Sequence, residues 1–169
     1  FRQVLAALKA VHDVGLIHRD VNPRNILVTR EGVVKLIDFG LSGPVKDVDH
    51  RMGGTLAYMA PEAMRKNSRL GFGLDLFAAG VMSYQAVLSL QGFKKLYGVK
   101  RPKDWIRWVL SSEPFKPLKE LGAPVSEGFS DLISRMLEKD PKVRYQKVAQ
   151  VQKDLDRHLE EIGYPTTGL

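Results

Sequence analysis

The stretch His18-Arg19-Asp20-Val21-Asn22-Pro23-Arg24-Asn25 decides the fold, together with Asp38-Phe39-Gly40 thirteen positions further on. A proline and two asparagines make the first stretch a loop. The apolar run Ile26-Leu27-Val28 directly after it predicts a short strand, and residues 33–37 predict its partner. The loop and the second motif therefore stand at the open end of one predicted hairpin.

The turn of this hairpin predicts which side chains lie opposite one another. A two-residue turn at Glu31-Gly32 pairs Arg30 with Val33. Counting back from that pair places Asn25 opposite Asp38. An amide oxygen and a carboxylate held side by side are suitable ligands for a divalent cation. The sequence therefore predicts a metal site at the open end of the hairpin.

The remainder of the chain is predicted to be mainly helical. The first fourteen residues have apolar side chains at helical spacing, which predicts a helix ended by Gly15, with Leu16-Ile17 extended after it. Residues 41–59 predict a long irregular loop, whose length indicates a function. A helix buried on most sides is predicted from Leu74 to Leu90, and the remaining predicted helices are 105–110, 129–137 and 148–162.

The composition is that of one globular domain. Of the 169 residues, 44% are hydrophobic and 27% charged, which excludes global disorder. The absence of cysteine excludes a disulfide framework and a thiolate zinc site. We find no apolar run of about 18 residues and no signal peptide, which predicts an intracellular, cytoplasmic protein. Because the chain begins at Phe1 rather than at methionine, we expect it to be a fragment.

The charge balance is basic. The chain has 26 basic and 19 acidic residues, a net charge of +7. We interpret this as a scattered basic surface, with no nucleic acid and no membrane as partner. The densest group is interleaved with apolar residues and is a weak candidate for a docking site. Its members are Lys94, Lys95, Lys100, Arg101 and Lys103.

Three later motifs complete a pattern that resembles a known family. They are Gly54-Thr55-Leu56-Ala57-Tyr58-Met59-Ala60-Pro61-Glu62, the segment that begins Asp75-Leu76-Phe77, and Asp140-Pro141-Lys142-Val143-Arg144. In this order and spacing, residues 1 to about 160 resemble the C-terminal lobe of eukaryotic-type protein kinases of the serine/threonine branch. The resemblance implies a mainly α lobe over 1–160 with small β hairpins around the catalytic loop, and a C-terminal tail at 161–169. It also implies that the N-terminal lobe, which ATP binding requires, is absent from this chain.

The resemblance implies roles for the catalytic loop and the hairpin. Asp20 corresponds to the residue that accepts the proton of the substrate hydroxyl. Asn22 stands where serine/threonine kinases have a lysine that reaches the transferred phosphate, and a neutral amide cannot supply that charge. Arg24 can compensate, in the way that tyrosine kinases use a displaced arginine. The cofactors implied are ATP and Mg²⁺ or Mn²⁺, with Asn25 and Asp38 as metal ligands and Asn25, Leu27 and Asp38 as nucleotide-binding residues.

Other matched residues are implied to bind substrate or to support the site. Gly54 and Thr55 correspond to the segment that holds the peptide, and a threonine there implies a protein substrate with a Ser or Thr acceptor. We interpret His12 as a surface or packing residue, and Trp105 with Trp108 as a structural stripe. The structural residues implied by the resemblance are His18, Arg19, Phe39, Gly40, Asp75, and the ion pair of Glu62 with Arg144.

The loop between Asp38 and Glu62 lacks a hydroxyl where activating phosphorylation usually occurs. That place falls near Arg51, so Arg19 needs another anion, for which Asp47 or Asp49 is a candidate.

We therefore expect the catalytic fragment of a serine/threonine protein kinase that is inactive without its smaller lobe. The alternative is a pseudokinase or scaffold lobe that binds protein partners, favoured by the neutral residue at position 22. A small-molecule phosphotransferase is a rival within enzymes. The Ala60-Pro61-Glu62 segment and Arg144 weigh against it, because in the family these parts serve protein substrates.

Overall fold

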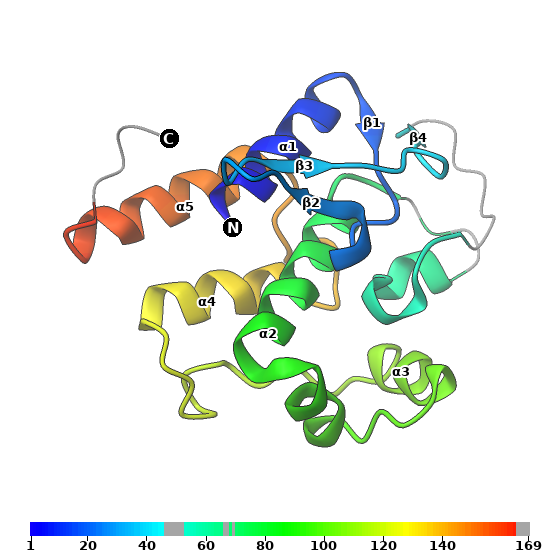
Figure 1. Cartoon of the computed structure of the whole chain (residues 1–169). Coiled ribbons are helices and arrows are strands. Elements are labelled where there is room, and N and C mark those ends of the chain that lie inside the picture. The colour runs from blue at the N-terminus through cyan, green and yellow to red at the C-terminus, as the bar shows by residue number, and fades with distance from the viewer. Residues whose placement is uncertain (46–52, 66–67, 69, 165–169) are drawn as a thin grey trace.

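Helices dominate the structure, and two small two-stranded sheets lie near one end of it (Figure 1). The computed structural model describes residues 1–45, 53–65, 68 and 70–164. The mainly helical fold with small hairpins is the one that the sequence predicts. Its elements are α1 (Arg2–Asp13), β1 (Leu16–Ile17), the 3-10 helix η1 (Pro23–Asn25), β2 (Ile26–Val28), β3 (Val34–Leu36), β4 (Gly43–Pro44), the 3-10 helices η2 (Leu56–Tyr58) and η3 (Pro61–Met64), α2 (Gly73–Leu96), α3 (Pro102–Val109), α4 (Glu127–Met136) and α5 (Val148–Glu161).

The first helix forms where its apolar stripe predicts it. Val4, Leu5, Leu8 and Val11 are buried, and α1 packs against α5 and β3. The helix ends at Asp13, and Gly15 follows with a φ of +77°, a conformation that glycine adopts without steric cost. Gly15 therefore turns the chain from α1 into β1.

The predicted register of the hairpin is wrong by one residue. In the structure Ile26 pairs with Leu36 and Val28 with Val34, so Asn25 lies opposite Ile37 rather than Asp38. The turn has three residues instead of two, and its last residue, Gly32, has a φ of +78°. The N–H of Gly32 donates to the Thr29 carbonyl at 3.0 Å. A glycine in this conformation suits both turn lengths, so the sequence did not distinguish them.

The second sheet was not predicted. Leu16 pairs with Pro44 and Ile17 with Gly43 in an antiparallel arrangement, so the chain returns to β1 directly after the hairpin. The segment predicted as irregular over 41–59 therefore begins with a short strand and contains the 3-10 helix η2 near its end. Within the described part of that segment, β4 contacts β1, and η2 contacts α2 and α3.

The central helix, α2, is buried on most sides over its first half, as predicted, but it continues to Leu96. Ser89 interrupts it with φ 63° and ψ 158°. By length and composition α2 could cross a membrane, although the sequence has no uninterrupted run of about 18 apolar residues. However, 61% of its apolar window is buried inside the protein, as in the core helix of a soluble domain. The burial of α2 is therefore explained by the packing of this lobe.

Gly80 of α2 allows a close approach of α4. A Cβ built at this position would lie 3.0 Å from Cβ of Met136 and 3.2 Å from Cδ2 of Leu137. We expect Gly80→Ala to lower the free energy of unfolding by about 1 to 3 kcal/mol, because overpacking shifts α4. In Gly92→Ala the nearest atom would lie at an ordinary 3.5 Å, so helix propensity should raise stability by up to about 1 kcal/mol. Equal effects in urea titrations of both variants would contradict this packing.

An aromatic cluster joins the end of α2 to α3. Trp105 and Trp108 lie 5.8 Å apart between ring centroids, and Trp105 is buried, which agrees with the predicted structural stripe. Nζ of Lys139 lies 3.8 Å from the centroid of the Trp108 ring and donates to the Trp108 carbonyl at 2.7 Å. The other rings of the cluster are Tyr84, Phe93, Tyr97 and Phe115.

Candidate active site

The carboxylate of Asp75 on α2 anchors the loop of residues 18–25. Oδ2 accepts from the backbone N–H of His18 at 2.8 Å, and Oδ1 accepts from that of Arg19 at 2.9 Å. Asp75 is 1% exposed, so both hydrogen bonds are shielded from water. Arg19 has a φ of +69°, which a non-glycine residue rarely adopts. The two bonds hold this strained turn and thereby fix where Asp20 lies.

His12 is a third partner of Asp75 that the sequence analysis missed. It is buried rather than on the surface, and its Nε2 lies 2.8 Å from Oδ2 of Asp75. Its ring also stacks on Phe72 at 4.4 Å between centroids. The signal was present in the sequence, because position 12 continues the buried stripe of Leu5 and Leu8 at helical spacing. His12 links α1 to the anchor of the loop.

The carboxylate of Asp20 is held by groups on both sides. Its Oδ1 accepts from the backbone N–H of Thr55 at 2.7 Å, and its Oδ2 accepts from Nδ2 of Asn25 at 3.0 Å. Partial burial raises the pKa of Asp20, but hydrogen bonds from Thr55, Asn22 and Asn25 outweigh it and leave the pKa below the ordinary value. The group is therefore ionised near neutral pH, as a proton acceptor must be.

Asn22 is buried and braces the loop. Its Nδ2 donates to the carbonyl of Asp20 at 3.0 Å and to Oγ1 of Thr55 at 3.2 Å. Its Oδ1 accepts from the backbone N–H of Arg24 at 2.9 Å and so caps η1. These bonds give Asn22 a structural use at the position where the resemblance implies a lysine. The side chain of Arg24 is exposed beside it.

Only glycine fits at position 54. Gly54 has a φ of +104°, and a Cβ there would lie 2.7 Å from the carbonyl oxygen of Arg19. The close approach lets the next residue, Thr55, donate its N–H to Asp20. A pocket beside Asp20 and Thr55 is lined further by Tyr58, Met59 and Leu74. The segment that the sequence predicts to hold a substrate therefore lies against the candidate catalytic carboxylate.

The metal-ligand candidates carry oxygens suited to Mg²⁺. Nδ2 of Asn25 donates to the Asp20 carbonyl at 2.8 Å and to the Asp20 carboxylate, which leaves Oδ1 of the amide for a cation. Asp38 has a φ of +63°, and its Oδ1 accepts from the N–H of Gly40 at 3.2 Å. An amide oxygen and a carboxylate fit the ligand preference of Mg²⁺.

Apolar side chains around these ligands are exposed. Leu27 on β2 is 50% exposed and Phe39 is 48% exposed. Phe39 rests edge-on against the buried ring of His18 at 4.9 Å between centroids, and Nε2 of His18 lies 3.0 Å from the Ile37 carbonyl. His18 is thus a packing residue beside the hairpin, as the sequence predicts, while the side chain of Leu27 is exposed on β2.

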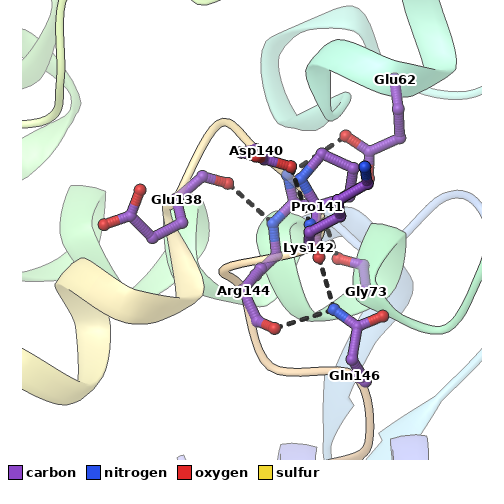
Figure 2. A network of polar contacts seen from close by, with 8 residues as sticks. All are labelled: Glu62, Gly73, Glu138, Asp140, Pro141, Lys142, Arg144 and Gln146. Atoms are coloured by element: carbon purple, nitrogen blue, oxygen red, sulfur yellow. Dashed lines mark hydrogen bonds and ion pairs between the residues drawn. The ribbon is translucent and has the colours of Figure 1, made fainter.

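Glu62 and Arg144 form the predicted ion pair (Figure 2). Nη1 of Arg144 lies 2.6 Å from Oε1 of Glu62, and Nη2 lies 3.1 Å from Oε2. The guanidinium also donates to the carbonyl of Gly73 at 3.0 Å and to that of Glu138 at 2.8 Å. Both side chains are buried. The pair therefore joins η3, the start of α2 and the loop before α5 at one point.

Comparison with known proteins identifies the family to which this geometry belongs. The family described as protein kinase domain matches residues 1–155. The chain belongs to the protein kinase family. Its kinase-like C-lobe fold, named from the motifs in the sequence, is confirmed by this match.

Curated kinases from distant organisms resemble the chain. It is 33% identical over 162 residues to the probable serine/threonine-protein kinase CPE1738 of Clostridium perfringens, covering 92% of this chain and 22% of that protein. It is 34% identical over 168 residues to the serine/threonine-protein kinase DCLK3 of mouse, covering 96% and 20%. The human protein of that name is 37% identical over 145 residues, covering 82% and 22%. The chain spans about a fifth of the length of these relatives.

The anion predicted for Arg19 lies outside the described residues. The structure does not describe residues 46–52, which include Asp47, Asp49 and the position near Arg51 where activating phosphorylation usually occurs in the family. A Cβ at Gly43 would lie 3.2 Å from Nη2 of Arg19, so the guanidinium packs on β4. This contact places the Arg19 side chain beside the beginning of the loop that the kinase family uses for activation.

Asp75→Asn tests how the loop of residues 18–25 is anchored. An amide has one acceptor oxygen, and whichever way it turns, its NH₂ group faces the N–H of His18 or of Arg19. We expect the free energy of unfolding to fall by about 1 to 3 kcal/mol, the cost of a buried group left unsatisfied. Asp131→Asn, on the exposed face of α4, is the matched control and should change stability by less than about 0.5 kcal/mol. Equal urea midpoints for the two variants would refute the anchoring role.

Proposed function

We propose that this chain is the catalytic half of a serine/threonine protein kinase that transfers the γ-phosphoryl group of ATP to a Ser or Thr hydroxyl of a protein. The observation that carries the proposal is the placement of Asp20. Its carboxylate is ionised, fixed by Thr55 and Asn25, and held on a loop that Asp75 anchors. The serine/threonine kinases among its relatives support the choice of acceptor.

The proposed reaction uses Asp20 to orient the acceptor. The substrate hydroxyl oxygen attacks the γ-phosphorus, the bond from that phosphorus to the β–γ bridging oxygen breaks, and ADP leaves. The hydroxyl proton passes to the carboxylate of Asp20. Because the pKa of Asp20 lies below the ordinary value, the carboxylate is a weak base and accepts this proton late in the transfer. Asn25 and Asp38 would hold Mg²⁺, which neutralises phosphate charge when bound.

A scaffold function is the second candidate, and the bonds of Asn22 favour it. The side chain of Asn22 is hydrogen-bonded to Asp20, Thr55 and Arg24, and it supplies no positive charge to a phosphate. In the scaffold alternative, the lobe keeps its fold and binds protein partners without transferring phosphate. The two candidates differ in whether the intact protein binds Mg²⁺-ATP.

Calorimetric titration of the intact two-lobe protein with ATP tests the nucleotide part of the proposal. We expect Mg²⁺-dependent binding that Asp38→Asn weakens by about tenfold or more, because a charged ligand becomes neutral. Asp131→Asn, far from the hairpin, should bind as the wild type does. We also expect no binding by the 169-residue chain alone, whose nucleotide-facing hairpin is exposed. Failure of the wild-type intact protein to bind Mg²⁺-ATP would favour the scaffold.

A further inference from the structure

Positive charge is concentrated where α2 ends and α3 begins. Residues 91–112 contain six basic residues and one acidic residue, Asp104. All six basic residues are exposed. We call this region the α2–α3 basic surface, and its members are Lys94, Lys95, Lys100, Arg101, Lys103 and Arg107.

The single carboxylate of this region is already engaged. Oδ2 of Asp104 accepts from the backbone N–H of Arg101 at 2.8 Å and from that of Lys100 at 3.2 Å, so it caps the start of α3. Nε of Arg101 lies 3.8 Å from the same oxygen. The backbone hydrogen bond from Arg101 lowers the pKa of Asp104, and Arg107 is close enough for its charge to contribute to this lowering. In the part of the chain that the structure describes, the four lysine side chains of the surface make no hydrogen bond and no ion pair. The region therefore keeps most of its charge for a partner.

The positive charges at the start of α3 oppose the stability of that helix. Arg101 precedes its first residue and Lys103 lies in its first turn, where the helix dipole disfavours positive charge. Arg107 lies in the last turn of α3, and Lys94 and Lys95 lie in the last turn of α2, where the dipole favours positive charge. Helix formation therefore does not account for Arg101 and Lys103.

The surface is built on two helices that are packed together, and it borders the segment proposed to hold substrate. The ring of Phe93 lies 5.5 Å from that of Trp105, and the ring of Tyr97 lies 4.2 Å from that of Trp108, so α2 and α3 are packed together. α3 also packs against η2, which begins one residue after Thr55. Figure 1 shows α3 below the teal segment that contains η2. A protein whose acceptor residue reaches Asp20 can therefore extend across this surface.

We propose that the α2–α3 basic surface docks an acidic segment of the protein substrate. This inference rests on the proposed function and adds the chemical class of the substrate. Aspartate and glutamate side chains complement the exposed lysines and arginines, and their attraction favours encounter at low ionic strength. Because these contacts lie outside the reaction site, they determine which substrate protein binds and do not change the rate of the transfer step.

Binding of labelled peptides to the intact protein tests the docking surface. The probe is a fluorescent peptide with one serine followed by a run of glutamates, and its partner peptide has glutamines instead. We compare the wild type with Lys94→Gln/Lys103→Gln/Arg107→Gln by fluorescence anisotropy. The matched control replaces two lysines and one arginine that are also exposed but lie elsewhere, Lys142→Gln/Lys153→Gln/Arg30→Gln.

We expect the surface variant to bind the glutamate peptide about tenfold more weakly, with the control variant unchanged and the difference reduced at high salt. Phosphorylation of the glutamine peptide should be equal in all three proteins. Equal binding of the two peptides by the wild type would overturn the docking proposal, whether or not transfer occurs. A larger loss of binding to anionic vesicles or to single-stranded RNA than to the glutamate peptide would also overturn it. Selective peptide binding without any transfer would support docking and contradict the proposed function.

Discussion

Arg144→Met is expected to lower the free energy of unfolding by about 3 to 5 kcal/mol. The variant keeps most of the apolar volume but leaves the Glu62 carboxylate buried without its partner. It also removes the donors that the carbonyls of Gly73 and Glu138 use. Denaturant titration of the chain, followed by circular dichroism, measures the loss.

Two comparisons separate the buried pair from a general effect of losing an arginine. Arg157→Met removes an exposed guanidinium that lies 3.1 Å from Asp154, and we expect a change within about 1 kcal/mol. Glu62→Leu/Arg144→Met leaves no lone charge inside the protein, so it should be more stable than Arg144→Met. If Arg144→Met and Arg157→Met unfold at the same denaturant concentration, the ion pair does not hold the lobe together.

The family resemblance predicted a pairing that local patterns could not. Glu62 and Arg144 are 82 positions apart, yet the resemblance named both partners, and the structure contains the pair. The first helix, in contrast, could be placed from local signals, because its buried stripe and Gly15 act within a few residues of one another. These helix signals do not depend on the rest of the fold.

Features that depend on tertiary packing could not be predicted. α2 extends past Leu90, where Phe93 and Tyr97 pack against the tryptophans of α3. No local pattern in the sequence predicts this packing. The hairpin register depended on a turn whose glycine suits two loop lengths.

Asp20→Asn is expected to reduce phosphoryl transfer by the intact protein by about 10² to 10⁴-fold, because an amide accepts no proton from the substrate hydroxyl. The substitution keeps the size of the side chain, but its NH₂ group would face the N–H of Thr55 or Nδ2 of Asn25. Circular dichroism therefore has to show that the variant is folded before its rate is compared with that of the wild type. Asp131→Asn, on the exposed face of α4, should transfer phosphate as the wild type does.

The most direct test of the central claim is the rate at which the intact protein transfers the γ-phosphoryl group of labelled ATP to peptides that contain serine, threonine or tyrosine. The account predicts Mg²⁺-dependent label on serine or threonine, none on tyrosine, and loss of transfer in Asp20→Asn. No transfer by a folded wild-type protein with ample Mg²⁺, or equal transfer by Asp20→Asn, would contradict it.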